Sequence, residues 1–463
     1  MKTICITLCL FCSCLISFGQ DLAGDWNGTI LPNNKPVRFI FHITRDGNTY
    51  NALIDIPDKR LTGLKAAQTV VTNEELVIDL SNMGMRYQGR FSADSQQLKG
   101  ILAEGANTWP LTLRRGTGES VQSVNRPQEP VKPYPYTEEE VSFSNIEAAI
   151  TLAGTFTRSA GNGKVPAVIL VSGSGPQDRD ETFSGHKPFL VLADFLTRHG
   201  IAVLRYDDRG VGASTGKHDQ ATTADFASDV LSAVSYLASR KDIDISRIGI
   251  IGHSEGGIIA PMVANRSKQV AFIVTLGATG IPGSEISFMQ AKATRGFPVP
   301  DESAWESAIR KAIRIASSDL DSATLKKTLI LHYQTTIAPI LRPYVGSDNE
   351  LNSIIAGMTA TRITPWARYF YNYNPADEFA KLTCPVLILN GSKDTQVQAK
   401  INQEGIRSAL ARGGNSNYTI KEFAGLNHLL QECATGLINE YSSITQTMAP
   451  AVLELIASWI ASR

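Results

Sequence analysis

Apolar and polar residues alternate one by one along the first part of the chain. In VRFIFHI (residues 37–43), every second side chain is apolar and falls on one face of an extended strand. Asp46-Gly47 then forms a hairpin signal before YNALIDI, and ELVIDL, YQGRFSA, LKGILAE and TWPLTLRR repeat the alternation. Residues 20–115 are therefore predicted to form a small antiparallel β domain with one buried face.

A different pattern begins at Val141. VSFSNIEAAITLAGTFTR alternates like strands at a sheet edge, and continuous apolar runs follow in VPAVILVSG, IAVLRYDD, RIGIIG and VAFIVTLGA. Amphipathic stretches such as FLVLADFLTRHG and ADFASDVLSAVSYLASR lie between those runs. Apolar strands separated by amphipathic helices indicate a mostly parallel sheet that is covered on both faces. Residues 141–463 are therefore predicted to be a doubly wound α/β domain.

The sheet pattern stops at Ile281 and resumes at CPVLILNGS, which begins at Cys384. The intervening residues, 281–383, contain helical stretches such as ESAWESAIRKAIRIASSDL and TLKKTLILHYQTTIAPIL. We expect this helical insertion to lie over the strand ends as a cap, because an insertion between two strands carries no sheet register of its own. In that position it would shape a pocket.

Two segments are predicted to lie outside these domains. Residues 116–140 contain four Pro residues and are expected to form an extended linker. Residues 1–19 hold one Lys, an apolar run, and the small residues Ser17 and Gly19, which is the layout of a signal peptide. The protein is therefore expected to be exported to the periplasm or the cell exterior. Lipidation at Cys14 is an alternative, but the residues before it fit a lipoprotein cleavage site poorly.

Composition narrows the classes of function. The 463 residues carry 44 Lys and Arg against 44 Asp and Glu, so there is no basic excess for nucleic acid. The early apolar run is too short for a convincing membrane span. Beyond residue 19 only Cys384 and Cys433 occur, and they are expected to be unpaired because a strand separates them. No Cys/His spacing indicates a metal site, and no cofactor is expected.

A candidate nucleophile lies in GHSEGG (252–257). The strand RIGII precedes this motif, and a helix is predicted from Glu255 onward. A serine at such a strand-to-helix turn is held exposed above the sheet, and Gly252 and Gly256 have no side chains to crowd the turn. An ordinary glycine-rich turn could contain the same motif. The strand and helix around it favour Ser254 as a nucleophile.

A serine hydroxyl needs a neighbouring base, and in this architecture the acid and then the histidine follow the serine along the chain. Only His332 and His428 follow Ser254, and His332 lies in the helical insertion. His428, in the loop after the last predicted strand, is therefore the predicted base. Asp394, in the loop after VLILN, is the predicted acid that orients it. Two reserve acids precede that strand, at its other end: Asp377 and Glu378.

Acyl transfer also needs backbone N–H groups that bind the oxyanion. The residue after the nucleophile, Glu255, supplies the first. The loop SGSGPQDRD supplies the second from Ser174 or Gly175, because Pro176 has no N–H. The alternative interpretation of this loop is a plain turn without a binding role. A phosphate-binding loop is excluded, because the lysine that the Walker motif requires is missing. Three charged residues after the next strand are interpreted as loop-holding ion pairs rather than substrate contacts: Asp207, Asp208 and Arg209.

Five pieces, in this order, resemble those of a known family: SGSGPQDRDE, YDDRGVGAS, GHSEGG, VLILNGSKDTQV and GLNHLLQ. They are similar to bacterial serine esterases of the α/β-hydrolase superfamily, with a helical cap and an N-terminal β domain. The resemblance covers residues 141–463 and implies hydrolysis of short acyl esters, with Ser254 as nucleophile, Asp394 as acid and His428 as base. One departure is Ser172, where many relatives carry His before the glycine of the oxyanion loop.

The expected function is that of a secreted serine carboxylesterase with a small-molecule or polysaccharide ester as substrate. A serine peptidase or an acyltransferase with the same triad is the alternative. A binding protein with an inert hydrolase core is a third hypothesis, and the complete triad counts against it. Acyl length, the alcohol, the oligomeric state and the role of the β domain are left open.

Overall fold

The computed structural model describes residues 22–30, 37–47, 49–59, 61–72, 75–80, 84–91, 96–104, 107–116, 126–295, 298–345 and 347–463. The predicted signal peptide, including Cys14, lies outside these residues. The chain divides into two compact units, one up to Gln122 and one from Ser123 onward. None of the helices in the described ranges is long and apolar enough to span a membrane.

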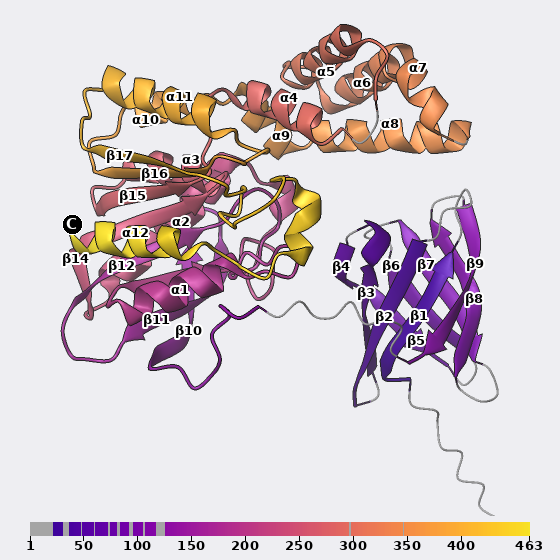
Figure 1. Cartoon of the computed structure of the whole chain (residues 1–463), viewed down its shortest axis with the longest axis horizontal. Coiled ribbons are helices and arrows are strands. Elements are labelled where there is room, and N and C mark those ends of the chain that lie inside the picture. Colours follow the sequence, from indigo (N-terminus) through magenta and orange to yellow (C-terminus); the bar gives the residue numbers. More distant parts are fainter. Residues whose placement is uncertain are drawn as a thin grey trace, which may run out of the picture. The chain divides into compact units, whose positions relative to one another are not determined.

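The first unit is a closed antiparallel sheet (Figure 1). Its strands are β1 (Gly24–Ile30), β2 (Val37–Asp46), β3 (Thr49–Ile56), β4 (Leu61–Lys65), β5 (Gln68–Val71), β6 (Glu75–Leu80), β7 (Met85–Phe91), β8 (Gln97–Glu104) and β9 (Asn107–Arg115). They pair in the order β4-β3-β2-β1-β9-β8-β7-β6-β5. The two ends of this order meet because β4 and β5 follow each other directly. Between them, the Ala66 N–H donates to β3 and the Ala67 N–H donates to β6.

Alternating apolar side chains fill the inside of this unit, as the period of two predicts. Phe39, Phe41 and Ile43 are buried there together with Tyr87. The Tyr87 hydroxyl donates to a backbone carbonyl oxygen at 3.0 Å. A Cβ on Gly89 would lie only 2.3 Å from that hydroxyl, so the glycine makes room for the ring.

His42 points to the other face of β2 and lies between two carboxylates. Its Nδ1 is 2.7 Å from Asp25 and its Nε2 is 3.1 Å from Asp55. The hydrogen bond with Asp55 is the main reason why the pKa of His42 rises to about 9, while partial burial acts in the opposite direction. The protonated ring therefore joins β1 and β3 across β2.

The second unit is built on a mostly parallel sheet with the order β10-β11-β13-β12-β14-β15-β16-β17. The strands are β10 (Tyr136–Asn145), β11 (Ile150–Ser159), β12 (Val165–Val171), β13 (Ala202–Tyr206), β14 (Ile243–His253), β15 (Val270–Leu276), β16 (Val386–Gly391) and β17 (Tyr418–Phe423). The pairs β10–β11 and β11–β13 are antiparallel, and every other pair in this order is parallel. This sheet, preceded by the antiparallel β unit, confirms the predicted fold class.

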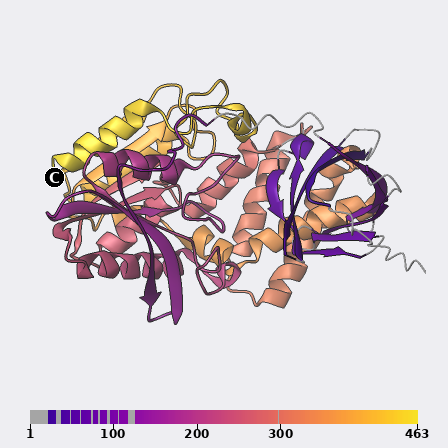
Figure 2. The same ribbon diagram turned by 90° about the horizontal axis from the view of Figure 1, so that it is seen from below.

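Helices cover both faces of this sheet because alternate strand residues point to opposite sides. On β12, Ala167 and Ile169 pack on one side with α2 (Thr223–Ser239), α3 (Gly256–Ala264) and α11 (Ala399–Arg412). Val168 and Leu170 pack on the other side with α1 (Pro188–Arg198) and α12 (Pro450–Ala461). In Figure 2, the yellow helix α12 runs along one face of the strands.

Between β15 and β16 the chain is helical. The helices are α4 (Gly283–Ala293), α5 (Glu302–Ala316), α6 (Ser322–Thr336), α7 (Ala338–Leu341), α8 (Asp348–Arg362), α9 (Pro365–Asn372) and α10 (Ala376–Phe379). Helices α5 to α8 lie together at one end of the unit (Figure 1) and have their own apolar core. Ile286 of α4 and Phe370 of α9 pack on Ile258 of α3, which attaches this cap to the sheet domain.

The boundary of the predicted linker differs from the structure. β10 begins at Tyr136, so residues 136–140 belong to the sheet rather than to the linker 116–140. Before that strand, Arg126 donates to the carbonyl oxygen of Ser442 at 3.0 Å, and Gln128 donates to that of Met448 at 2.7 Å. The backbone turns here, because the Glu129 N–H donates to the Arg126 carbonyl oxygen at 3.0 Å, and the polar side chains find acceptors on the folded unit.

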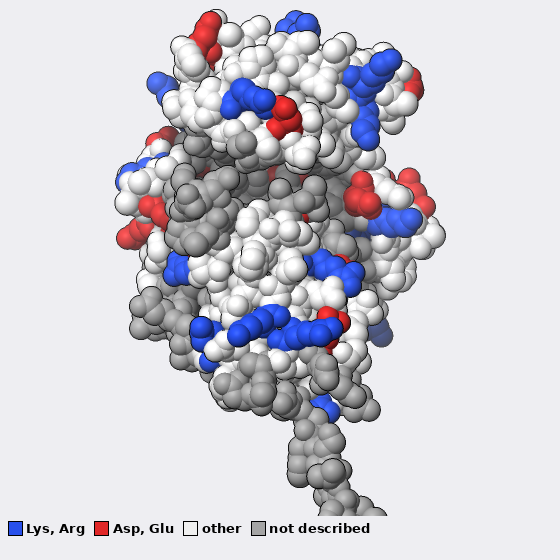
Figure 3. Space-filling view, turned by 90° about the vertical axis from the view of Figure 1, so that its right-hand side faces the viewer, with Lys and Arg blue, Asp and Glu red and all other residues white. Residues whose placement is uncertain are grey.

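Charged side chains of both signs appear among uncharged residues on the face shown in Figure 3. Several charged side chains of the second unit are paired, as in the contact of Arg310 with Glu285 at 2.7 Å. The two described cysteines, Cys384 and Cys433, are both unpaired, as predicted.

Candidate active site

Ser254 stands at the turn between β14 and α3. Its φ angle is +51°, a left-handed conformation that costs a residue with a Cβ about 1–2 kcal/mol. The neighbouring chain passes very close: a Cβ on Gly252 would lie 2.0 Å from the Gly256 carbonyl oxygen, and one on Gly256 would lie 2.1 Å from that of Val171. The Ser254 N–H donates to the Leu276 carbonyl at 2.8 Å and ties the turn to β15. The sequence around Ser254 thus folds into a tight, strained strand-to-helix turn.

His428 and Asp394 lie together beyond the carboxyl ends of β17 and β16. Nδ1 of His428 is 2.7 Å from Oδ2 of Asp394, and both side chains are buried. The other carboxylate oxygen accepts the N–H groups of Gln396 at 2.9 Å and Val397 at 2.8 Å. A carboxylate held in this way favours a proton on Nδ1 and leaves Nε2 of His428 as the proton acceptor.

Ser254 and His428 line the same cavity, which has a volume of about 360 Å³. The alternative base His332 and the alternative acids Asp377 and Glu378 lie elsewhere. Nε2 of His332 faces the Ala308 carbonyl in the cap at 2.8 Å. Asp377 and Glu378 lie on α10, and neither lines the cavity. The structure therefore brings the predicted Ser, His and Asp together, whereas the alternative histidine and the two alternative acids lie outside the cavity.

The predicted oxyanion donors flank the nucleophile. Glu255 precedes the first residue of α3, and no hydrogen bond between described residues uses its backbone N–H. Ser174 lines the cavity, whereas Gly175 does not. The N–H of Gly173 is already engaged, because it donates to a carboxylate of Glu181 at 2.7 Å. Of the two predicted second donors, the cavity favours Ser174.

Residues 168–440, more than half of the chain, match the profile of the alpha/beta hydrolase family. The chain belongs to this family. The resemblance that the five sequence pieces indicated is thereby confirmed. The N-terminal antiparallel unit agrees with the β domain that the same resemblance implied.

Individual relatives are distant. Esterase EstD of Thermotoga maritima is 28% identical over 303 residues, which cover 65% of this chain but only 61% of that relative's length. Proline iminopeptidase of Lactobacillus delbrueckii subsp. bulgaricus is 23% identical over 283 residues, covering 59% of this chain and 88% of that protein. Among solved structures, esterase Pf2001 of Pyrococcus furiosus is 16% identical with a TM-score of 0.43, covering 73% of this chain and 96% of that one.

The side chain of Glu255 is buried beside the nucleophile turn of this α/β hydrolase. Its carboxylate accepts the indole N–H of Trp366 and the hydroxyl of Thr223, both at 2.7 Å, and it also bonds the Ser174 hydroxyl. Burial raises the pKa of Glu255, and these hydrogen bonds act against that rise. Because Trp366 belongs to α9, one carboxyl group connects the cap, the oxyanion loop and α3.

Asp208 is a second carboxyl, partly buried beneath the oxyanion loop. It accepts the Ser172 hydroxyl and the Gln177 N–H, each at 3.0 Å. Burial raises the pKa of Asp208 to about 8, although these hydrogen bonds lower it. Ser172 thus supports the loop through Asp208. Among the described residues Asp208 has no basic partner, so the expectation of an ion pair is wrong at this position.

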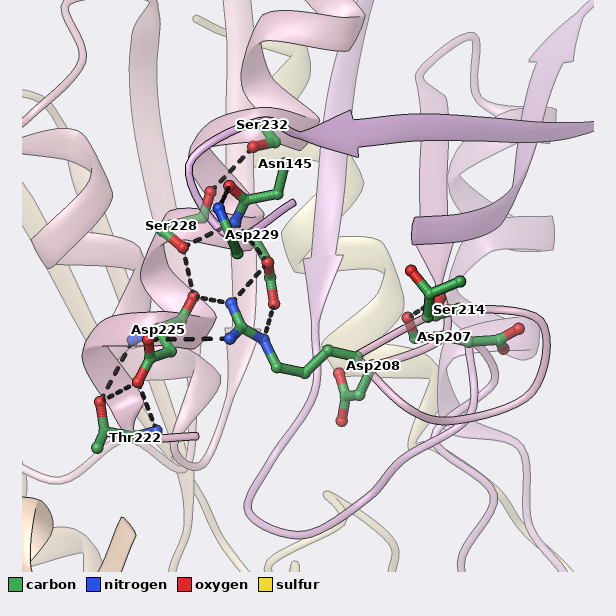
Figure 4. Close-up of polar contacts among 12 residues, drawn as sticks. Asn145, Asp207, Asp208, Ser214, Thr222, Asp225, Ser228, Asp229 and Ser232 are labelled. Carbon is green, nitrogen blue, oxygen red and sulfur yellow. Dashed lines mark hydrogen bonds and ion pairs between the residues drawn. The ribbon is translucent and has the colours of Figure 1, made fainter. Parts of the chain in front are cut away.

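Its neighbours Asp207 and Arg209 do form the expected ion pairs. Asp207 lies 2.8 Å from Arg179 in the oxyanion loop. Arg209 lies 2.7 Å from Asp229 of α2, where Asn145 adds a further hydrogen bond (Figure 4). Neither Asp207 nor Arg209 lines the cavity, so both hold loops in place.

The hydrolase cavity is formed by loops of the sheet domain and by two cap helices. The cap contributes Gln290, Ala291 and Thr294 at α4 and Trp366 from α9. The rest of the lining, apart from the residues already described, is uncharged except for one acid–histidine pair: Gln177, Glu181, Phe183, His253, Thr395, Gln396 and Leu429.

Sequence reasoning missed three residues of this site. Glu181 ends the piece SGSGPQDRDE, and His253 directly precedes the nucleophile in GHSEGG, so both lay inside motifs that had been noticed. Within those motifs the glycines and the serine explain the turn, so neither Glu181 nor His253 stands out as part of the site. No sequence signal identifies Trp366, because its partner Glu255 is 111 residues away.

Proposed function

We propose that the protein is a secreted serine carboxylesterase that hydrolyses short-chain acyl esters. One observation carries the proposal: Ser254, in its strained turn, shares a cavity with His428, and His428 lies 2.7 Å from the buried Asp394. Similarity to esterase EstD supports it independently. Export rests on the signal-peptide layout of residues 1–19.

In the proposed reaction, Oγ of Ser254 attacks the ester carbonyl carbon while Nε2 of His428 takes the hydroxyl proton. Asp394 stabilises the resulting imidazolium and does not itself accept the proton. Backbone N–H groups of Glu255 and of Ser174 or Gly175 bind the oxyanion. His428 then protonates the leaving alcohol, and an acyl-enzyme remains. A water molecule, deprotonated by His428, attacks that ester, and collapse releases the acid and restores Ser254.

The cavity supports a small, neutral substrate. Its volume of about 360 Å³ is near the lower end of ligand pockets, which suits a short acyl group. The amides of Gln177, Gln290 and Gln396 can both donate and accept hydrogen bonds, as a hydroxyl-bearing alcohol would require. Trp366 and Phe183 add flat apolar surfaces. A small-molecule ester or an acylated polysaccharide chain end would satisfy these conditions.

A serine peptidase or an acyltransferase with the same triad is the second candidate. The similarity to proline iminopeptidase favours it, since that name describes cleavage of a peptide bond. Rates on a matched pair of substrates separate the two chemistries. An esterase hydrolyses a nitrophenyl ester much faster than the corresponding nitroanilide, and an acyltransferase forms a new ester when an alcohol is added.

The test is hydrolysis of nitrophenyl esters from acetate to long acyl chains by the mature protein. Ser254→Ala should lower kcat by about 10⁴-fold or more, because the nucleophile is lost. Ser235→Ala, on the exposed side of α2, is the matched control and should keep the rate of the unmodified protein. No activity on any ester, together with no labelling of Ser254 by a fluorophosphonate, would overturn the proposal.

A further inference from the structure

A second acid–histidine pair lies beside the proposed triad. Oε1 of Glu181 is 2.7 Å from Nδ1 of His253, and the two side chains are only 4% and 9% exposed. His253 directly precedes Ser254, and its ring centroid is 4.7 Å from that of His428. The reaction described above uses neither residue.

The hydrogen bonds of His253 define its protonation. Its Nε2 lies 3.1 Å from the carbonyl oxygen of His428, and a carbonyl can only accept, so Nε2 carries a proton. Its Nδ1 faces the carboxylate of Glu181, which also accepts the Gly173 N–H at 2.7 Å. Burial alone would lower the pKa of His253, but the Glu181 charge and these hydrogen bonds raise it above its ordinary value. Both ring nitrogens thus face acceptor oxygens, which favours the doubly protonated ring beside Glu181 and leaves no nitrogen free to act as a base.

Glu181 reaches this position at a cost in its backbone. Its φ angle is +52°, the left-handed region that is unfavourable for a residue with a Cβ. Its N–H donates to the Asp178 carbonyl at 2.9 Å, which fixes the turn. Strain of this kind persists where surrounding contacts over-determine the conformation, and it concentrates at functional sites.

We propose that Glu181 and His253 are positioning residues for the proposed hydrolysis. The pair connects three separate segments: the oxyanion loop through the Gly173 N–H, the nucleophile turn through His253, and the base loop through the His428 carbonyl. It fixes the oxyanion donors and the His428 backbone relative to Ser254. The inference rests on the proposed function, because it assigns the pair a role in that reaction.

The first test removes the carboxylate. Glu181→Leu leaves both N–H donors without an acceptor, and kcat for nitrophenyl acetate should fall about 100-fold, because a misplacement of about 1 Å has this effect on a transition state. KM should change little, since substrate binding does not need the same alignment. Glu181→Gln should restore kcat to within about 10-fold of the unmodified protein, because its amide can bond both Gly173 and a neutral His253.

The matched control is Asp180→Asn. Asp180 is the adjacent carboxylate in the same loop, but it pairs with Arg205 of β13 and does not line the cavity. Its loss should lower the melting temperature and leave kcat unchanged within about two-fold. Melting temperatures of all variants show whether a change in rate comes from unfolding.

A double-mutant cycle tests whether the pair acts as one unit. His253→Asn alone should also lower kcat. The kcat of the double variant with Glu181→Leu should be no more than about three-fold below that of the less active single variant, since the effects of coupled residues are not additive. Losses that multiply would overturn the proposal.

The outcomes separate this inference from the proposed function. If Ser254→Ala is inactive but Glu181→Leu keeps its kcat, changes only KM, or behaves like Asp180→Asn, the positioning role is overturned and the esterase function stands. If the unmodified protein hydrolyses no ester, both are overturned.

Discussion

Asp394 illustrates how much the site depends on single residues. Its carboxylate is buried, bonds two backbone N–H groups, and determines which nitrogen of His428 carries the proton. An amide at this position would present an N–H group to the ring and favour the opposite tautomer. In the proposed reaction, His428 could then no longer accept the Ser254 proton through Nε2.

We therefore expect Asp394→Asn to lower kcat by about 10³- to 10⁴-fold with little change in KM. Steady-state hydrolysis of nitrophenyl acetate measures both constants. The control is Asp377→Asn, which removes an exposed carboxylate that lies 3.4 Å from Arg412 on the surface. An Asp377 variant as impaired as the Asp394 variant would show that the acid had been misassigned.

His42 provides a prediction for the N-terminal unit. Its pKa is about 9 in the folded unit against 6.5 for the free side chain, so the protonated ring stabilises the fold. This contribution is complete below about pH 6.5 and is lost as the pH rises through about 9. His42→Gln should lower the melting temperature of the unit by several degrees at pH 6 and hardly at all at pH 10. Equal destabilisation at both pH values would contradict the ionic explanation.

At the scale of elements, the contact between α9 and α3 determines how the cap meets the nucleophile turn. Trp366 donates its indole N–H to the buried carboxylate of Glu255 and stacks on Phe370, with ring centroids 5.1 Å apart. Loss of a hydrogen bond to a buried charged group costs about 1.5–3 kcal/mol. The cap is therefore anchored at the residue that, in the proposed reaction, also supplies an oxyanion donor.

Trp366→Phe keeps an aromatic ring but removes the N–H group. We expect kcat/KM to fall about 10-fold, because a lost bond worth about 1.5 kcal/mol corresponds to that factor. Kinetics together with a thermal melt measure the effect. The control is Trp459→Phe in α12, since the indole N–H of Trp459 makes no hydrogen bond to any described group of the protein. If both variants behave alike, the link between α9 and Glu255 has no role in activity.

The strands and helices could be predicted largely because each buries a regular face. The period of two identified the strands of the first unit, and apolar runs identified β12 to β16, which are buried on both faces. The start of β10 was not predicted, because the consecutive charged residues Glu138, Glu139 and Glu140 hide the alternation of this edge strand and read like a linker. Chain order and elimination indicated Ser254, Asp394 and His428. Glu181 and His253 each lie in one of the five pieces, but their pairing could not be predicted, because it depends on packing between segments 72 residues apart.

At the scale of the whole molecule, the two units have separate apolar cores. One core lies inside the closed sheet, and two others cover the faces of the hydrolase sheet. Every residue assigned to the proposed reaction belongs to the second unit, which begins at Ser123. The chemistry is therefore not expected to require the first unit.

A shortened chain of residues 123–463 should fold and hydrolyse nitrophenyl acetate with a kcat/KM within about two-fold of the full-length protein, since the two cores are independent. The corresponding Ser254→Ala variant provides the background rate. A large loss on this small substrate would mean that the β unit contributes to the site. A loss of kcat/KM that is confined to polymeric esters would instead show that the β unit helps to bind such substrates.

The left-handed turn at Ser254 implies a trade-off between durability and activity. Every copy of the enzyme retains about 1–2 kcal/mol of backbone strain there, a cost that selection for stability alone would remove. Ser254→Gly would release that strain, but glycine also makes the unfolded chain more flexible, which destabilises the fold. The net result should be a variant up to about 1 kcal/mol more stable than the active protein. Differential scanning calorimetry can measure this, and a lower melting temperature would refute it. In the proposed reaction this strained backbone presents the Ser254 hydroxyl to the cavity, so activity and stability oppose each other at this residue.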